Sequence, residues 1–274
     1  MRGIIKHPDY ELEYFVFGNG PKTLMAFHGF NNNAADFNVL GKIAGNEYSI
    51  VAINIFFHGD SRAHDRMIDE GFSVSDLKDL FNDITNILPS KKYTLLGYSL
   101  GGRIALKLFE LFPERIESII LLAPDGIRVS PMYRFLTGTL AGRKLLKRVT
   151  YEPSAFLFIA SMLRKTGLVG EKKYQFAKNN YDSRLKREKV FQVWMTLRNV
   201  ISENRVIREL LKTYNIKMHL FFGKYDRIIP ASIGEKFSIG SEETVKLHVL
   251  EEGHRMIGES TLAHVMATIK DPQY

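Results

Sequence analysis

The sequence predicts an α/β protein, with a mainly parallel central sheet flanked by helices and interrupted by a helical insertion. Two observations support this fold class. Short apolar runs alternate with amphipathic stretches along most of the chain, as β–α units require. The alternation stops in the middle of the sequence and resumes near the C-terminus. One sheet is therefore expected to be built from two separated parts of the chain.

The expected strands share short apolar runs rich in β-branched and aromatic residues, and they are residues 11–17, 23–27, 48–55, 93–96, 117–123, 217–222 and 245–250. The expected helices of the same part of the fold are residues 75–88, 100–112 and 261–269. Within the expected strand at 117–123, residues 119–123 are all apolar, which is typical of a parallel strand buried on both faces.

No convincing strand occurs between residues 127 and 214, where the segments are helical and rich in basic residues. We therefore expect an α/β core domain of residues 1–126 and 215–274, and a helical cap, or lid, of residues 127–214. The charge is also unevenly placed. Of a net charge of +8, residues 125–210 hold 18 basic against 7 acidic side chains, whereas the rest is close to neutral.

Composition excludes several kinds of site. The chain has no cysteine, which removes disulfides, thiolate metal sites and a cysteine nucleophile. The eight histidines show no paired metal-binding spacing, so no metal or organic cofactor is expected. The N-terminus is too charged for a secretory signal core, and no run reaches the ~18 apolar residues of a membrane-spanning helix. We expect a cytoplasmic protein, and the sequence leaves its oligomeric state open.

Residues 97–101 read Gly-Tyr-Ser-Leu-Gly and match the G-x-S-x-G nucleophile elbow. In this motif the serine occupies a tight turn between a strand and a helix, so that its hydroxyl projects above the sheet. Small flanking residues are needed because the turn is strained and the helix packs close to the strand. The expected strand precedes the motif and the expected helix follows it, which predicts Ser99 as a nucleophile.

A serine hydroxyl needs a base to take its proton and a carboxylate to hold that base. Asp226 and His254 each follow an expected strand, at the carboxyl ends where α/β sheets place their sites. The order Ser, Asp, His along the chain is also that of elbow-type enzymes. We predict a triad of these three residues. Asp125, which follows the strand at 117–123, is an alternative acid, and geometry has to decide between the two.

An oxyanion hole needs two backbone N–H groups aimed at the developing negative charge. Leu100, the residue after the nucleophile, should supply one of them. The loop after the strand at 23–27 should supply the other, and Phe30 in the sequence His28-Gly29-Phe30 is the best candidate.

Four segments together resemble the α/β-hydrolase superfamily, and they are residues 28–30, 97–102, 223–226 and 253–254. The resemblance covers essentially the whole chain, and the insertion matches the variable cap of that family. It implies the roles of nucleophile, acid, base and oxyanion donors for Ser99, Asp226, His254, Phe30 and Leu100. Serine at the elbow argues against haloalkane dehalogenases and epoxide hydrolases, which use aspartate there. The chain departs at residues 54–61, Asn-Ile-Phe-Phe-His-Gly-Asp-Ser, where many members have D-x-x-G-x-G-x-S.

Three functions from different classes follow. The leading prediction is hydrolysis of a carboxylic ester or related acyl bond of a small molecule, through an acyl-enzyme on Ser99. The second is a lyase, because residues 97–103 are similar to the elbow of the menaquinone-pathway enzyme that eliminates pyruvate. That enzyme uses its triad as a base and holds an anionic substrate with cationic residues. The third is a non-catalytic ligand receptor on the same scaffold.

Most of the cap's basic residues are expected to form a solvated face. Two functional interpretations stay open beside that one. The cap could rest on an anionic lipid surface, or one or two inward-facing arginines could bind a substrate carboxylate or phosphate. The substrate would accordingly be lipid-like or anionic. Nucleic acid is not an expected partner, because no recognised binding motif accompanies the charge.

Overall fold

The computed structural model describes residues 1–167 and 183–270 and contains one large sheet. The strands are β1 (Arg2–His7), β2 (Tyr10–Phe17), β3 (Lys22–Phe27), β4 (Tyr48–Ile53), β5 (Arg62–Ala63), β6 (Tyr93–Tyr98), β7 (Ile116–Leu122), β8 (Lys217–Gly223) and β9 (Val245–Leu250). The α-helices are α1 (Asn38–Ala44), α2 (Asp65–Glu70), α3 (Val74–Ile87), α4 (Gly101–Leu111), α5 (Pro131–Gly138), α6 (Leu140–Tyr151), α7 (Pro153–Lys165), α9 (Arg184–Thr196), α10 (Asn204–Thr213), α11 (Ser232–Ser238) and α12 (Glu259–Thr268). Short 3₁₀ helices are η1 (Ala34–Phe37), η2 (Pro113–Arg115) and η3 (Leu197–Asn199).

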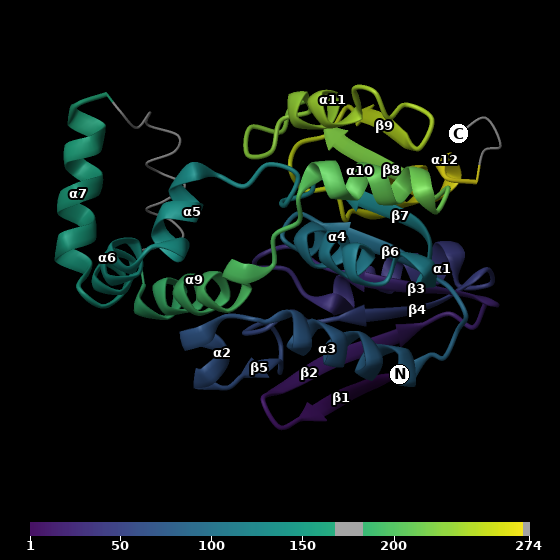
Figure 1. The fold of residues 1–274 in the computed structure, drawn as a ribbon, viewed down its shortest axis with the longest axis horizontal. Coiled ribbons are helices and arrows are strands. Elements are labelled where there is room, and N and C mark those ends of the chain that lie inside the picture. The colour runs from purple at the N-terminus through teal and green to yellow at the C-terminus, as the bar shows by residue number, and fades with distance from the viewer. Residues whose placement is uncertain (168–182, 271–274) are drawn as a thin grey trace. The chain divides into compact units, whose positions relative to one another are not determined.

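The strand order is β1-β2-β4-β3-β6-β7-β8-β9, with β5 paired to β2 (Figure 1). From β4 to β9 every neighbouring pair in this order is parallel, whereas β1, β2 and β4 pair in antiparallel fashion. The predicted α/β fold with a mainly parallel sheet is thereby confirmed. Its central strands end at the same edge, so the loops that follow them come together there.

Helices cover both faces of the sheet. On one face, turned toward the viewer in Figure 1, α4 packs on β3, β6 and β7, with α3 and α10 beside it. On the other face α1 and α12 pack together over a core that includes buried residues of β3, β4, β6 and β7. Every residue of β6 is buried, as is typical of a central strand in a parallel sheet. Burial of these apolar side chains holds the sheet and its helices together.

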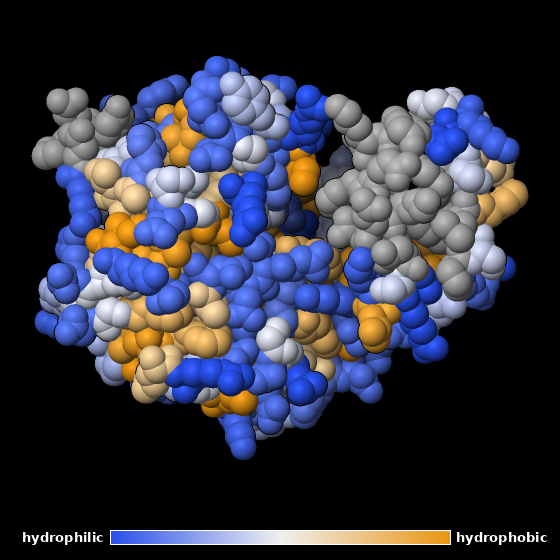
Figure 2. All heavy atoms as spheres, turned by 180° about the vertical axis from the view of Figure 1, so that it is seen from behind, coloured by the Kyte–Doolittle hydropathy of each residue, from blue (hydrophilic) through white to orange (hydrophobic). Residues whose placement is uncertain are grey.

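Figure 2 shows the molecule from behind, where hydrophilic residues make up most of the surface and hydrophobic residues form patches between them. Scattered apolar residues are normal on a folded surface. In the described ranges, no helix combines the length and the hydropathy that crossing a membrane would demand.

The chain divides into two compact units. The first contains the sheet and consists of Met1–Ala63, Ser73–Val129 and the described residues from Val200 on. The second consists of His64–Phe72 and the described residues of Ser130–Asn199. The bounds of this second unit differ from those expected for the cap, which were 127–214. Residues 168–182 of the expected cap lie outside the described residues. Helix α10 belongs to the first unit because it packs on α4 and buries Ile207 and Leu211.

The second unit is helical and has its own small core. Helix α6 packs against α5, α7 and α9, and α2 packs against α9. The buried core residues are Leu146, Phe191 and Met195. Two basic residues are buried here and form no part of a solvated face. Arg187 donates from Nε to the carbonyl of Thr150 at 2.8 Å, and Arg198 donates from Nη1 to the carbonyl of Ile68 at 2.8 Å.

Two histidines stack on neighbouring strands near the end of the sheet. The rings of His219 on β8 and His248 on β9 are nearly parallel, with centroids 5.5 Å apart. Burial lowers the pKa of His219 to about 4, and the neighbouring His248, Lys246 and Lys217 add to this effect. The folded protein therefore holds His219 neutral at pH values where an unfolded chain would protonate it.

This histidine should make the fold sensitive to mild acid. As the pH falls below about 6.5, the unfolded chain binds the proton first and is stabilised, until the folded state binds it near pH 4. The free energy of unfolding should decrease over this window by at most about 3 kcal/mol from this group. Replacing His219 by Phe should make the decrease smaller, as measured by urea unfolding at pH 7 and pH 4.5.

His64→Gln is the matched control, because His64 is exposed at the N-cap of α2. It should follow the wild-type pH dependence. An equal decrease in the wild type and His219→Phe would show that buried His219 does not contribute.

Candidate active site

The turn between β6 and α4 carries Ser99 in a left-handed backbone conformation, with φ of 48°. Two hydrogen bonds fix this turn against the next strand. The N–H of Ser99 donates to the carbonyl of Leu122 at 2.9 Å, and its own carbonyl accepts from the N–H of Asp125 at 2.9 Å. Ser99 follows the last residue of β6 and precedes α4, so it lies at the carboxyl edge of the sheet, as the elbow motif predicts.

Glycine at position 101 allows the helix to start so close to the sheet. A Cβ added there would lie 2.0 Å from the carbonyl oxygen of Phe27 at the end of β3. No side chain tolerates that separation, so Gly101 is required by the packing of α4 on β3.

The loop after β9 brings His254 to the nucleophile. Its Nε2 lies 3.1 Å from Oγ of Ser99, although 155 residues separate the two in sequence. The hydroxyl of Tyr98 donates to the backbone carbonyl of His254 at 3.0 Å and so holds this loop. Burial raises the pKa of Tyr98 to about 12, with a further contribution from the nearby Asp226 carboxylate. The tyrosine therefore stays protonated and remains a donor.

The loop after β8 brings Asp226 to the other side of the imidazole. Oδ2 of Asp226 lies 2.7 Å from Nδ1 of His254, and the carboxylate side chain is fully buried. Its other oxygen accepts the N–H groups of Ile228 and Ile229 at 2.8 and 2.9 Å. Burial alone would raise the pKa of Asp226, but the hydrogen bonds with His254, Ile229 and Ile228 outweigh it and hold the pKa below its ordinary value.

These contacts indicate which nitrogen of the neutral His254 ring carries the proton. A carboxylate can only accept, so Nδ1 of His254 carries the proton and Nε2 presents a lone pair to Ser99. The structure thus brings together the three residues that the sequence singles out, in the line Ser99, His254, Asp226.

Asp125, the alternative acid, has a different partner. Its Oδ2 lies 2.8 Å from Nη2 of Arg103, whose side chain is only 3% exposed. Arg103 is in the first turn of α4, so this ion pair connects the helix to the loop after β7. Of the two carboxylates, Asp226 is the one that contacts His254.

The two expected oxyanion donors belong to segments that adjoin Ser99. Leu100 is the N-cap residue of α4. Phe30 is in the loop after β3, and that loop passes close to the nucleophile, because a Cβ added at Gly29 would lie 3.1 Å from Cβ of Ser99. The amino end of α4 adds a partial positive charge at this point. Their role as donors stays a prediction.

Comparison with known proteins decides the family. The model of the α/β hydrolase fold family matches residues 22–238, which is most of the chain. The chain belongs to the α/β hydrolase fold family. The mainly parallel sheet described above is thus that of an α/β hydrolase.

Three similar proteins illustrate the range within this family. The Bacillus subtilis (strain 168) hydrolase YugF is 25% identical over 86% of this chain and 84% of its own length. A thermophilic esterase from Thermogutta terrifontis has a similar structure, with a TM-score of 0.67 and 17% identity over 98% of this chain and 97% of that one. A Bacillus subtilis protein named as a 2-succinyl-6-hydroxy-2,4-cyclohexadiene-1-carboxylate synthase is 27% identical over 40% of each chain.

Sequence reasoning did not identify the groups that hold the α/β hydrolase site in place. These are the Tyr98 hydroxyl, the N–H groups of Ile228 and Ile229, and the Arg103–Asp125 ion pair. Only Tyr98 carries a local signal, since it occupies the variable position of the elbow motif. In residues 1–167 and 183–270, no three His, Asp or Glu side chains gather as they would around a metal ion.

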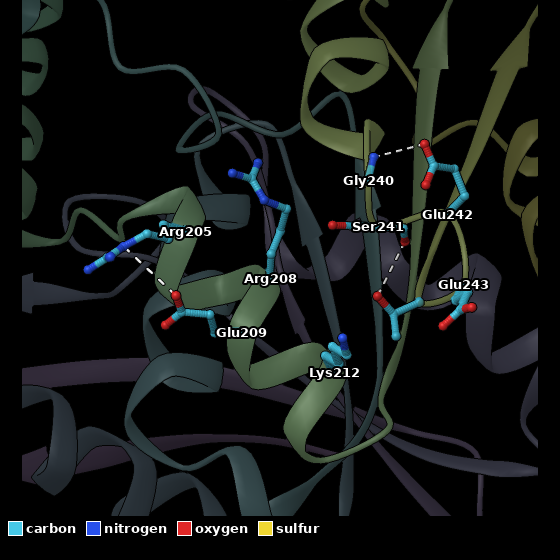
Figure 3. Close-up of a pocket in the computed structure, with 9 residues that line it drawn as sticks. Arg205, Arg208, Glu209, Lys212, Gly240, Ser241, Glu242 and Glu243 are labelled. Atoms are coloured by element: carbon cyan, nitrogen blue, oxygen red, sulfur yellow. Dashed lines mark hydrogen bonds and ion pairs between the residues drawn. The ribbon is translucent and has the colours of Figure 1, made fainter.

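A cleft of about 430 Å³ lies between α10 and the loop before β9 (Figure 3). It opens at the amino end of β9, whereas the triad follows the carboxyl ends of β8 and β9. Its charged lining residues are Arg205, Arg208, Lys212, Glu209, Glu242 and Glu243. Three basic and three acidic side chains balance one another, so this cleft has no net preference for an anion.

The elbow should tolerate no side chain at position 101. Gly101→Ala should lower the free energy of unfolding by about 1–3 kcal/mol or more, because the added Cβ meets the Phe27 carbonyl and forces α4 away from β3. Thermal or urea unfolding of purified protein measures this. Gly253→Ala is the control, since nothing lies within 4 Å of a Cβ added there. Equal effects of the two substitutions would contradict the packing argument.

Proposed function

We propose that this α/β hydrolase cleaves a carboxylic ester or related acyl bond of a small molecule through an acyl-enzyme on Ser99. One observation supports this most directly. Ser99 Oγ, the two nitrogens of His254 and the buried carboxylate of Asp226 form a continuous line, with contacts of 3.1 and 2.7 Å. A receptor on the same scaffold would have no use for such an arrangement, because only a nucleophile requires a base and an acid behind it.

In the first half of the proposed reaction, Oγ of Ser99 attacks the acyl carbon while Nε2 of His254 takes the hydroxyl proton. The carbonyl oxygen becomes an oxyanion, which the N–H groups of Phe30 and Leu100 stabilise. His254 then gives the proton to the leaving alcohol, and the acyl group remains on Ser99. Asp226 keeps the imidazole in the required tautomer and stabilises its positive charge.

In the second half, water replaces the alcohol. Nε2 of His254 takes a proton from the water as its oxygen attacks the acyl carbon, and a second oxyanion forms in the same place. Collapse of this intermediate returns the proton to Ser99 and releases the carboxylic acid.

The second compact unit is proposed as the cap that selects the substrate. The chain leaves the sheet after β7, at the carboxyl edge where Ser99 lies, and returns before α10. The described residues of this unit hold 13 basic and 5 acidic side chains. Two of the basic residues, Arg187 and Arg198, are buried, and the others still give this unit a positively charged surface. Such a surface favours an anionic or lipid-like substrate, and contact with an anionic membrane surface would fit it equally well. The cytoplasmic location stays a prediction from the sequence.

A lyase is the second candidate, because part of the chain is similar to the Bacillus subtilis protein named as a cyclohexadiene carboxylate synthase. In that case Ser99 and His254 would remove a proton from the substrate and form no acyl-enzyme. The two candidates share the site and differ in the reaction it performs.

Ester hydrolysis is tested with a panel of p-nitrophenyl esters from acetate to decanoate. The wild type should release p-nitrophenol, and the chain-length profile should show which acyl group the site accepts. Ser99→Ala should lose about 10⁶-fold in kcat, because the residual rate comes from the oxyanion donors and binding alone. Turnover that survives in Ser99→Ala would contradict the proposed mechanism, and no turnover of any ester by the wild type would favour the lyase.

The acid of the triad is tested by comparing Asp226→Asn with Asp125→Asn. Asp226→Asn should lower kcat by about 10⁴-fold, because the amide stabilises the wrong imidazole tautomer. Asp125→Asn should keep kcat within the same order of magnitude and should instead lower the free energy of unfolding by about 1–3 kcal/mol, because the ion pair between Arg103 and residue 125 is lost. The reverse pattern would transfer the acid role to Asp125.

A further inference from the structure

The loop that carries Phe30 is held by the loop after β4. We define residues 28–34 as the oxyanion loop and residues 54–61 as the support loop. Two backbone N–H groups of the oxyanion loop donate to side chains of the support loop. The N–H of Asn31 donates to Nε2 of His58 at 3.1 Å, and the N–H of Ala34 donates to Oδ1 of Asn54 at 2.7 Å.

The support loop also anchors the beginning of the oxyanion loop. The N–H of Ile55 donates to Nε2 of His28 at 3.1 Å, and Nδ1 of the same ring lies 2.7 Å from the carbonyl of Gly29. The histidine is fully buried. Phe30 is therefore flanked on both sides by residues that are hydrogen-bonded to the support loop.

His58 is placed to accept and not to donate at this contact. Nδ1 lies 3.0 Å from the carbonyl of Phe56, which can only accept, so Nδ1 carries the proton and Nε2 has the lone pair. The ring is 2% exposed, and the ring of Phe30 packs edge-on against it with centroids 5.5 Å apart.

The hydrogen bond from the Asn31 N–H to His58 holds a backbone conformation that few residues other than glycine adopt. The φ of 63° at Asn31 lies in the left-handed region, which asparagine adopts more readily than most residues but which is still less favourable than a helical or extended backbone. Contacts with the surroundings therefore help to fix this conformation. The contact with His58 is one that does so, directly after the peptide that carries the proposed oxyanion donor.

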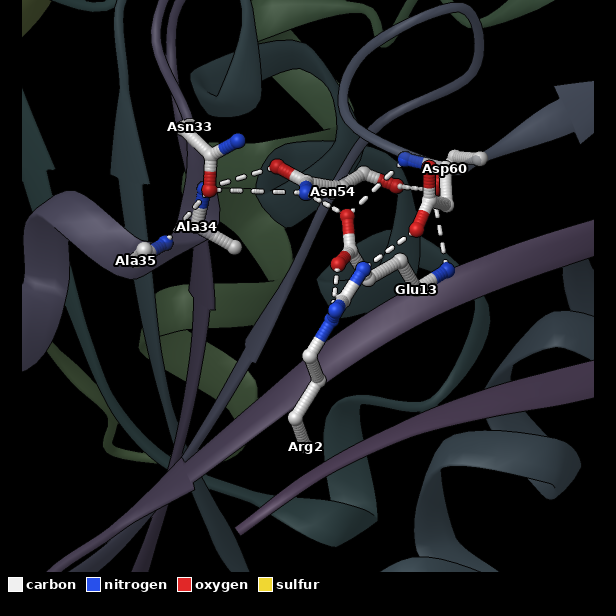
Figure 4. A network of polar contacts seen from close by, with 8 residues as sticks. Arg2, Glu13, Asn33, Ala34, Ala35, Asn54 and Asp60 are labelled. Carbon is white, nitrogen blue, oxygen red and sulfur yellow. Dashed lines mark hydrogen bonds and ion pairs between the residues drawn. The ribbon is translucent and has the colours of Figure 1, made fainter.

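Asn54 is itself fixed by a buried carboxylate, shown in Figure 4. Nδ2 of Asn54 donates to Oε2 of Glu13 on β2 at 2.6 Å, and the N–H of Asp60 donates to the same oxygen at 2.9 Å. Arg2 donates from Nε to Oε1 of Glu13 at 2.5 Å. Glu13 is 3% exposed, and these partners hold its pKa below the ordinary value despite burial, which alone would raise it.

We propose that His58 is a positioning residue for the oxyanion hole, assisted by Asn54 and Glu13. His58 holds the Asn31 N–H, Asn54 holds the Ala34 N–H, and together they orient the peptide N–H of Phe30 toward the carbonyl oxygen of the substrate. This inference rests on the proposed function, since it assigns a support to one of its oxyanion donors. The proposed effect of His58 acts through Asn31 and the peptide of Phe30.

The test replaces His58 by Leu and by Gln and measures p-nitrophenyl ester hydrolysis. Leu removes the acceptor, whereas the side-chain oxygen of Gln reaches a similar place and can still accept from Asn31. His58→Leu should lower kcat by about 10- to 100-fold, somewhat less than the loss of a whole oxyanion donor. KM should change by less than about threefold, because the substrate is bound elsewhere, and His58→Gln should recover most of the lost kcat.

Exposed His264 on α12 gives the matched control, and His264→Leu should behave as the wild type. A merely structural role would give lower folded yield for His58→Leu, with unchanged kcat per folded molecule and no rescue by Gln. That result would overturn the positioning role. Absence of turnover in the wild type would instead overturn the proposed function, so the two failures are distinguishable.

A second set of variants covers the case in which His58→Leu does not fold. Asn54→Asp places two carboxylates against each other and should lower kcat. Adding Glu13→Gln should restore part of the lost kcat, because the amide introduced on β2 can donate to the new carboxylate, which still accepts from Ala34. Restoration stays partial because the N–H of Asp60 loses Oε2 of Glu13 as its acceptor. A double variant no faster than Asn54→Asp would contradict the support proposed for this loop.

Discussion

The backbone of Ser99 is the constraint on which the rest of the site depends. A φ of 48° costs a serine on the order of 1–3 kcal/mol, and it is kept because strand β6 and helix α4 are both buried and cannot turn otherwise. The N–H of Ser99 donates to the carbonyl of Leu122, and the carbonyl of Ser99 accepts from the N–H of Asp125, so both backbone groups of Ser99 are fixed. The resulting geometry directs the hydroxyl away from the core and places the amino end of α4 behind it.

Around this turn, each proposed chemical group is held by a neighbour that does not react. Tyr98 fixes the loop of His254, and the N–H groups of Ile228 and Ile229 fix the Asp226 carboxylate. The oxyanion loop is held in the same way by the support loop. Preorganisation of this kind lets charge develop on the substrate without rearrangement of the protein, which is the largest contribution in many enzymes.

The sequence predicted those features whose signal is local. The parallel strands have apolar runs, and the triad residues each follow such a run, so both the fold and the three residues could be named in advance. Strand β1 was missed because it lies at the edge of the sheet, pairing only with β2, and has only exposed and partly exposed residues. The bounds of the cap stay a prediction. Helix α10, inside those bounds, packs against α4 of the first unit, and helical periodicity does not reveal such a contact. Glu13 carried no signal at all, since its partner Asn54 is 41 residues away.

The proposed activation of Ser99 by His254 is tested most directly by covalent labelling of the wild type and His254→Ala with a fluorophosphonate, followed by mass spectrometry of the digested protein. An activated serine attacks this probe irreversibly, and activation requires the neighbouring base. If Ser99 and His254 act as proposed, the wild type should carry a single adduct on the peptide that contains Ser99, and His254→Ala should carry none. An adduct on another residue, or equal labelling of Ser99 without His254, would contradict this proposal.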